Sequence, residues 1–545
     1  MKKKIILIAA LFLAAAADTF ACTNLIVGKK ASADGSTIVS YSADSYGLFG
    51  ELYHYPAATH PKGTMRDVYE WDTNKYLGQI EEARQTYNVI GNINEFQVTI
   101  AETTFGGREE LVNPAGIIDY GSLIYIALQR STHAREAIKV MTDLVQQYGY
   151  CSGGESFTIA DPNEVWIMEM IGKGPGIRGA VWVAVRIPDD CVSAHANQAR
   201  IHTFDTSDKN NCIASPDVIS FAREKGYFTG INKDFSFAKA YNPLDFGGRR
   251  YCEARVWSYL NMFTDMGSEH LPYILGKTDE PMPLYWKANR RLSVQDIQNA
   301  MRDHYEGTAL DISNDLGAGP YKTPYRLSPL SFKIDGEEYF NERPISTQQS
   351  GWVFVSQMRS DKIDAIGGVL WFGLDDANMC VFTPVYCCTT KVPDSYAANG
   401  ADYITFSWNN GFWIYNWVAN MVYPRYELMI GDVREVQQGL EKSFHDAQDA
   451  IEATAAKMFQ NDPEAAKAFL TNYTNMMADN TIASWKKLGE YLIVKYNDGV
   501  VKRMKDGQFE RNDIGQPASV IRPGFPQEYL KEYVKQTGNR YKMNN

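Results

Sequence analysis

Cys22 is the residue most suited to chemistry by its type and position. In "AAAADTFACTNLIVGKK" it follows an apolar stretch and leads directly into a predicted strand. Thr19 and Ala21 are small, as the two positions that a signal peptidase reads usually are. Cleavage after Ala21 leaves an α-amino group with a pKa of ~7.7–8.0 on the same residue as a thiol with a pKa of ~8.5. Nucleophile and general base then share one residue. We therefore expect cleavage also to be the activation step.

Asp44 is the predicted partner of Cys22. The segments "CTNLIVG" and "STIVSYSAD" flank the turn-rich "KKASADG", in which Asp34-Gly35 is a strong hairpin signal. A turn centred near residues 33 and 34 places Asp44 next to Cys22 at one edge of a sheet. A carboxylate there could hold the new ammonium group and orient the thiol. The alternative is an ordinary strand-terminal Asp in a turn.

Residues 1–21 are predicted to be a signal peptide, because three lysines precede an apolar core at residues 5–17. The core is shorter than the ~20 residues of a membrane span, and no later segment reaches that length, so we expect an exported protein of the periplasm or the extracellular space. A lipid anchor on Cys22 is the main alternative. Against it, Phe20 is large for a lipobox, and the strand pattern after Cys22 leaves no flexible linker.

The composition is that of a large folded chain. Its 545 residues are 45% hydrophobic and 13% aromatic, enough for a sizeable core and about two to four domain-sized units. The formal charge is −11 and about −13 without the signal peptide, which argues against nucleic acid as a partner. The eight cysteines are sparse for a disulfide scaffold and have no C-x-x-C spacing, so neither a metal site nor a cofactor is predicted.

The predicted elements mix antiparallel strands with helices. Residues 96–105 are predicted as a strand, residues 121–148 as two helices that meet near Ser131-Thr132, and residues 156–170 and 181–197 as two hairpins. Strands in antiparallel pairs with helices between them favour the α+β class, in which helices pack on antiparallel sheets.

A set of segments in collinear order gives the chain a family resemblance: "CTNLIVGKKASADGSTIVSYSAD", "NEFQVTIAETTFGG", "ESFTIADPNEVWIMEM", "AHANQARIHTFD", "RDHYEGTALDIS" and "ERPISTQQSGWVFVSQMRS". Together they resemble the cysteine dipeptidase A family of N-terminal-nucleophile hydrolases, which is related to penicillin V acylase and bile salt hydrolase. The resemblance runs from Cys22 to about Tyr386. It implies a four-layer αββα sandwich, cleavage that exposes the cysteine, no metal, and hydrolysis of short peptides.

The resemblance also implies roles for single residues. Cys22 matches the nucleophile, Asp44 matches the carboxylate that steadies its amine, and Asn197 in "AHANQAR" matches an asparagine that donates to the oxyanion. Two positions depart from the acylase relatives, because Tyr41 stands where they have an arginine and Thr104 where they have an asparagine. Both positions are predicted to line the substrate site.

The missing arginine leaves the activation of the thiol open. Arg250 or Arg255 in "GGRRYCEARVW" could replace it, and Arg255 is predicted to line the substrate site. Glu102 and Glu155 are candidate acids for a substrate ammonium, although most Glu residues at strand ends are simply solvated. His304 invites a Cys-His pair, but a nucleophile with its own amine does not need one. We expect a polar His at a helix or loop rim.

These patterns predict a signal peptide at residues 1–21, a catalytic domain at residues 22–422 and a mainly helical C-terminal extension at residues 423–545, with a helix start at Asp462-Pro463. The signal-peptide pattern predicts export, and the resemblance implies a cysteine dipeptidase that acts through an acyl-enzyme on a dipeptide or short peptide. Two alternatives stay open: an N-acyl amide hydrolase of the penicillin V or bile acid type, and a lipid-anchored binding protein. Whether the chain forms a homo-oligomer is also open.

Overall fold

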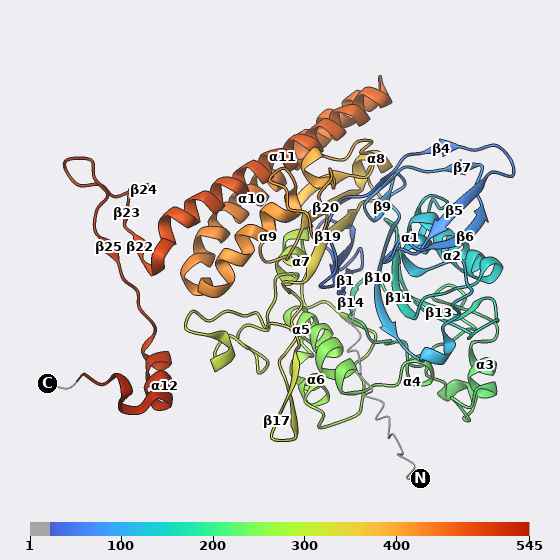
Figure 1. The fold of residues 1–545 in the computed structure, drawn as a ribbon. Coiled ribbons are helices and arrows are strands. Elements are labelled where there is room, and N and C mark those ends of the chain that lie inside the picture. The colour runs from blue at the N-terminus through green and yellow to red at the C-terminus, as the bar shows by residue number, and fades with distance from the viewer. Residues whose placement is uncertain (1–21, 544–545) are drawn as a thin grey trace, which may run out of the picture.

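The computed structural model describes residues 22–543, so the predicted signal peptide lies outside the described residues. Most of its strands belong to two antiparallel sheets (Figure 1). The first sheet consists, in spatial order, of β16 (Tyr285–Lys287), β14 (Cys191–His195), β1 (Asn24–Val27), β2 (Thr37–Asp44), β19 (Ser350–Met358), β20 (Val369–Leu374) and β21 (Thr383–Tyr386). The second sheet consists of β15 (Cys212–Ala214), β13 (Ala180–Ile187), β12 (Val165–Gly172), β11 (Gly154–Ala160), β10 (Thr99–Gly106), β9 (Ile93–Asn94), β8 (Val89–Ile90) and β3 (His54–Tyr55).

Helices pack on both sheets, which confirms a fold of mixed α and β structure. The second sheet packs against α1 (Tyr120–Leu128) and α2 (Ala134–Tyr148). The helices that contact the first sheet are α5 (Ala254–Phe263), α7 (Val294–Ala300), α9 (Gly411–Val422), α10 (Tyr426–Phe459) and α11 (Pro463–Tyr496).

The side chains of β12 show how these layers are stacked. Trp166, Met168 and Met170 lie in one hydrophobic cluster with α1 and α2, whereas Ile167 and Ile171 lie in a larger cluster with the first sheet. Successive side chains of a strand point to opposite faces. The second sheet is therefore enclosed between the helix pair and the first sheet, and the two sheets pack face to face.

His195, at the end of β14, ties the two sheets together. Its ring nitrogens lie 2.7 Å from the hydroxyl oxygen of Thr103 on β10 and 2.7 Å from that of Thr158 on β11. Burial lowers the pKa of His195 to about 3, so the ring stays neutral at physiological pH. This uncharged link fixes the end of β14 against β10.

The predicted helix pair and the first predicted hairpin are confirmed as α1 with α2 and β11 with β12. The second predicted hairpin is wrong, because β13 belongs to the second sheet and β14 to the first. The main chain at residues 188–191 accepts hydrogen bonds from the amides of Gly28 and Lys30, next to β1. These bonds direct β14 toward β1. An alternating apolar pattern predicts a strand but does not identify its partner.

A hairpin of β5 (Met65–Tyr69) and β6 (Tyr76–Glu81) lies beside the start of α1. The amide of Trp71 donates to the carboxylate of Asp119, the N-cap of α1, and the hydroxyl of Ser122 donates to the carbonyl of Tyr69. The tip of the hairpin is thereby held against the second sheet's helix layer.

The C-terminal part contains two long helices. α10 and α11 are helices of 34 residues each and run side by side (Figure 1). Asp462 caps α11 by accepting from the amide of Ala465, and Pro463 occupies the first turn. Residues 497–543 then form an arm that ends in α12 (Gln527–Thr537), a helix that buries none of its residues.

The eight cysteines all lie within the described residues and are all free. No helix between residues 22 and 543 combines the length and the apolar character that crossing a membrane requires.

Candidate active site

The predicted site residues come from five elements that meet where the ends of the two sheets approach one another. Cys22 immediately precedes β1 and is buried, with 3% of its surface exposed. The others are Tyr41 and Asp44 on β2, Glu102 and Thr104 on β10, Asn197 just after β14, and Arg255 on α5.

The pairing of β1 with β2 differs by one residue from the predicted register. Thr23 bridges Ser42, so that Ala43 lies opposite Cys22 and Asp44 lies one residue beyond it. The reason is the asymmetry of the connection, in which the amide of Ala31 bonds back to the carbonyl of Gly28. The start of β1 and the end of β2 still meet, as the hairpin signal predicts.

β14 brings Asn197 to the other side of Cys22. Asn24 pairs with His195, and two residues further along both strands Cys22 and Asn197 lie level with one another. Cys22 is therefore flanked by the ends of two neighbouring strands.

The thiol of Cys22 lies in an acidic and apolar environment. Its Sγ donates to Oε1 of Glu102 at 3.6 Å and lies 3.6 Å from the hydroxyl of Tyr41, which donates to the same oxygen at 2.7 Å. Burial raises the pKa of Cys22 well above its usual value, and the negative charges of Glu102 and Asp44 raise it further. A positive charge or a base is needed beside this thiol before it can ionise at neutral pH.

Asp44 is fully buried and has partners that the sequence did not single out. Arg343 donates to its Oδ2 at 2.5 Å, and the hydroxyls of Ser350 and Ser42 donate to its two oxygens at 2.6 and 2.9 Å. Arg343 and Ser350 both lie in "ERPISTQQS", one of the segments that carry the family resemblance. The resemblance of that segment to the family was the available signal for these two residues. The residue spacing within it does not indicate that either residue contacts Asp44.

Arg255 is the candidate arginine that contacts Cys22. It donates to the carbonyl of Cys22 at 2.6 Å and to the amide oxygen of Asn197 at 2.9 Å. Burial lowers its pKa to about 10, so it stays charged at neutral pH. Arg250 pairs with Glu342 instead. The structure thus brings one of the two candidate arginines to Cys22.

Asn197 is held in a defined orientation. Its backbone has a φ of 64°, in the left-handed region that Asn tolerates better than most residues. Its amide nitrogen donates to the carbonyl of Thr104 at 2.8 Å, and its amide oxygen accepts from Arg255. The side chain is therefore fixed between β10 and α5.

A cluster of acids adjoins Glu102. The hydroxyl of Thr104 donates to Glu155 at 2.8 Å, and the hydroxyl of Tyr120 donates to Asp72 at 2.9 Å. Burial raises the pKa of Glu102 and of Glu155, and the charge of Glu102 raises that of Glu155 further. The charge of Asp72 acts in the same direction on both. Two such carboxyl groups tend to share one proton until a cation joins them.

His304 does not lie at a rim, so that expectation is wrong. It is buried after α7, its Nδ1 lies 3.2 Å from Glu306, and its ring packs on Tyr325 at 4.8 Å. Glu306 is two residues away in the same segment, whereas Tyr325 comes from a later segment whose contact with His304 the local sequence could not reveal. Within residues 22–543, no three His, Cys, Asp or Glu side chains are arranged to hold a metal ion.

Cys22 is thus buried between strand ends, with Arg255 on its main-chain carbonyl and Arg343 on the neighbouring carboxylate of Asp44. The chain belongs to Peptidase family C69, whose profile matches residues 21–439. The family membership that the sequence motifs indicate is therefore confirmed.

Curated relatives carry dipeptidase names. The chain is 27% identical to a probable dipeptidase of Latilactobacillus sakei over 84% of its own length and 92% of the relative's. It is 29% identical to a probable dipeptidase of Salmonella dublin over 67% and 81% of the two chains. It is 24% identical to dipeptidase A of Lactobacillus helveticus over 73% and 81%.

Proposed function

We propose that this protein is an exported cysteine dipeptidase in which removal of residues 1–21 frees Cys22 as an N-terminal nucleophile. The names of the relatives support the activity. Two face-to-face sheets with helices on their outer sides fit the four-layer αββα sandwich of N-terminal-nucleophile hydrolases.

The freed α-amine of Cys22 supplies the base that the thiol requires. As an ammonium it lies close to Asp44 and Glu102, whose negative charges favour it, and it opposes the effect that these charges have on the thiol pKa. As a neutral amine it accepts the thiol proton. Asp44 and Arg343 hold the strand end that positions this residue.

The reaction proceeds through an acyl-enzyme. The thiolate of Cys22 attacks the peptide carbonyl, and Asn197 together with a main-chain N–H stabilises the oxyanion. Thr104 and Arg255 support this role because they fix the Asn197 amide. The amine then protonates the leaving amine, and water releases the acyl group.

The acidic cluster is the observation that supports a dipeptide with a free α-ammonium group as the substrate. Glu102 contacts the nucleophile, and Glu155 and Asp72 lie near Glu102, on the side where a dipeptide would place its α-ammonium group. A cation there pairs with carboxylates that otherwise repel one another. An N-acyl amide has no such cation, and its apolar acyl group would leave the buried carboxylates unpaired.

Hydrolysis of free and N-acetylated dipeptides tests the proposal. We expect Ala-Ala to be cleaved and N-acetyl-Ala-Ala to be at least about 100-fold poorer in kcat/KM, because rejection of a ligand that leaves buried polar groups unpaired is strong. Glu155→Gln should reduce the ratio of kcat/KM between Ala-Ala and N-acetyl-Ala-Ala, because it removes one of the carboxylates that pair with the α-ammonium group. Faster cleavage of the N-acetylated substrate would instead indicate an N-acyl amide hydrolase.

The mass and N-terminal sequence of the exported protein test the maturation step. A free Cys22 is the expected result. A diacylglyceryl group on Cys22 would contradict the proposal and leave the lipid-anchored alternative.

A further inference from the structure

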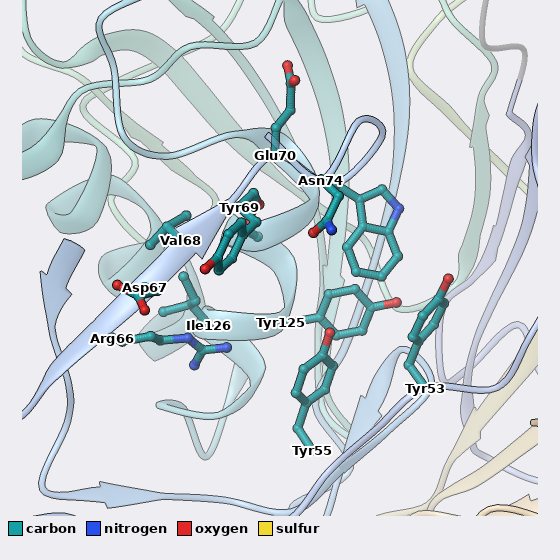
Figure 2. A pocket seen from close by; sticks show the side chains of 12 residues that line it. Tyr53, Tyr55, Arg66, Asp67, Val68, Tyr69, Glu70, Asn74, Tyr125 and Ile126 are labelled. Atoms are coloured by element: carbon teal, nitrogen blue, oxygen red, sulfur yellow. Dashed lines mark hydrogen bonds between the residues drawn. The ribbon is translucent and has the colours of Figure 1, made fainter. Parts of the chain in front are cut away.

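An aromatic cavity lies between the β5–β6 hairpin and α1. It has a volume of about 370 Å³, within the usual range of ligand pockets. The aromatic side chains that line it are Tyr53, Tyr55, Tyr69, Trp71 and Tyr125. Figure 2 shows the rings of Tyr53, Tyr55, Tyr69 and Tyr125 together with Arg66 of β5 and Ile126 of α1.

The rings are held in place by one another. Trp71 stacks on Tyr125 with 4.7 Å between ring centroids, and Tyr53 meets Trp71 edge to face at 4.8 Å. Tyr55 packs on Tyr125 at 5.0 Å. The wall is thus preformed, which lowers the entropic cost of binding.

Two sets of neighbouring residues connect the lining of the cavity to the surroundings of Cys22. Tyr53 packs on Trp352 at 5.8 Å, and Trp352 packs on Tyr41, the residue that contacts Cys22. In the hairpin, Trp71 of the cavity is followed directly by Asp72 of the acidic cluster.

The charged residues of the lining are engaged by neighbours. Arg66 donates to Gln129 at 2.5 Å and lies 3.5 Å from Glu82. Asp67 accepts from Gln79 on the next strand at 2.8 Å, and Glu70 accepts from Thr73 within the hairpin turn. The cavity therefore offers mainly aromatic faces, on which another aromatic ring packs favourably.

We infer that this cavity receives the side chain of the substrate's N-terminal residue and favours an aromatic one. The inference rests on the proposed function. If the acidic cluster binds the α-ammonium, the side chain on the same Cα leaves from beside Asp72, and the neighbouring Trp71 opens onto the aromatic cavity. The side chain of the second residue, beyond the scissile bond, does not enter it.

Tyr69 and Tyr76 offer a matched pair of variants. They pair across the hairpin, with 5.4 Å between their rings, and are exposed to similar extents, 45% and 52%. Tyr69 lines the cavity, whereas Tyr76 is not among the residues that form it. Replacing either residue with Ala removes one similarly exposed ring and the same ring–ring contact. A difference between the two variants therefore reports on the cavity and not on the stability of the hairpin.

The test compares Phe-Ala, Ala-Phe and Ala-Ala as substrates. Tyr69→Ala should lower kcat/KM for Phe-Ala about three- to tenfold, as expected for the loss of one aromatic contact, mainly through KM. Ala-Phe and Ala-Ala should change less than about twofold, and Tyr76→Ala should leave all three substrates unchanged. An equal loss for all substrates, a loss confined to Ala-Phe, or no loss for Phe-Ala would overturn the inference.

Binding of phenylalaninamide and alaninamide to the Cys22→Ala protein, measured by calorimetry, separates this inference from the proposed function. Tighter binding of phenylalaninamide that Tyr69→Ala weakens and Tyr76→Ala does not would support the cavity even if no dipeptide were hydrolysed. If the protein with Cys22 intact hydrolyses Ala-Ala but the Cys22→Ala protein binds the two amides equally, the inference about the cavity is overturned. The dipeptidase proposal then stands.

Discussion

The Cys22 thiol is buried beside Glu102, and its surroundings oppose its ionisation. Because an alcohol is a much weaker nucleophile at neutral pH and a methyl group is none, we expect Cys22→Ser and Cys22→Ala to lower kcat for dipeptides by at least about 10³-fold. Circular dichroism should be unchanged. Near-normal turnover by Cys22→Ala, measured on a preparation with a verified N-terminus, would contradict the nucleophile.

Asp44 and Arg343 form a buried ion pair, with 0% and 4% of their side chains exposed. Asp44→Asn removes the charge that stabilises the proposed ammonium and leaves Arg343 buried without its carboxylate. We expect loss of activity and also a loss of about 3–5 kcal/mol in the free energy of unfolding, measured by urea denaturation.

A double variant separates these two effects of Asp44. Asp44→Asn with Arg343→Met removes both charges, so stability should recover in part while activity does not. A double variant that regained full activity would show that Asp44 serves only to balance Arg343.

At the residue scale the sequence predicted much of the site. The small residues before Cys22 and the hairpin signal after it were enough to bring Cys22 and Asp44 to one place, within one residue of register. Arg343 could not be predicted in the same way, because it comes from a loop 299 residues away from Asp44. Local patterns do not encode such a contact.

The end of β20 carries a buried acid with an unusual pKa. Asp375 follows this strand with a φ of 67° and accepts from Asn416 on α9 at 3.0 Å, while its Oδ2 has no hydrogen-bond partner among the described residues. Burial raises its pKa to about 8. The folded protein therefore keeps a proton that the unfolded chain releases near pH ~4, and this acid makes stability fall as pH rises from about 4 to 8.

Asp375→Asn should therefore stabilise the protein at high pH. Asn tolerates the same backbone conformation and carries no charge, so we expect Tm to rise by about 1–3 °C at pH 8.5 and to change little at pH 4.5. The exposed Asp394→Asn is the matched control and should show no such pH dependence. An equal change of Tm at both pH values would contradict the assigned protonation.

At the scale of elements, periodicity identified strands and helices better than their partners. The α1–α2 pair and the β11–β12 hairpin follow from local patterns, since each joins neighbours in the chain. β13 and β14 are also neighbours in the chain, yet they belong to different sheets because β1 competes for β14. The small β5–β6 hairpin that shapes the aromatic cavity was not predicted, because its exposed strands lack a clear apolar alternation.

For the whole molecule, buried ion pairs hold α10 against segments that follow α7 and β19. Glu452 of α10, 2% exposed, pairs with Arg359 at 2.7 Å and with Lys362 at 2.5 Å. Glu441 of the same helix pairs with Arg302 at 2.5 Å. Since the large hydrophobic cluster also extends into α10 and α11, we expect the helices and the sheets to unfold together.

Glu452→Gln tests this coupling, because it leaves two cations beside a buried neutral side chain. We expect a loss of about 3–5 kcal/mol and a lower Tm for a single calorimetric transition. Asp446→Asn removes an exposed pair with Lys442 on the same helix, 63% and 72% exposed, and should cost less than about 1 kcal/mol. Two separate transitions in Glu452→Gln would show that the helices form an independent unit.

The place of β1 in the middle of the first sheet also decides how the protein can be made. β1 lies between β14 and β2 and starts two residues after Cys22, so under the proposed function any tag fused ahead of Cys22 would block the amine that the nucleophile needs. Recombinant production therefore needs a leader that is cut off before Cys22, with the purification tag on the arm that carries α12. If Cys22 acts as proposed, a batch with mixed N-termini contains inert molecules, and its specific activity must be referred to titrated active sites instead of total protein.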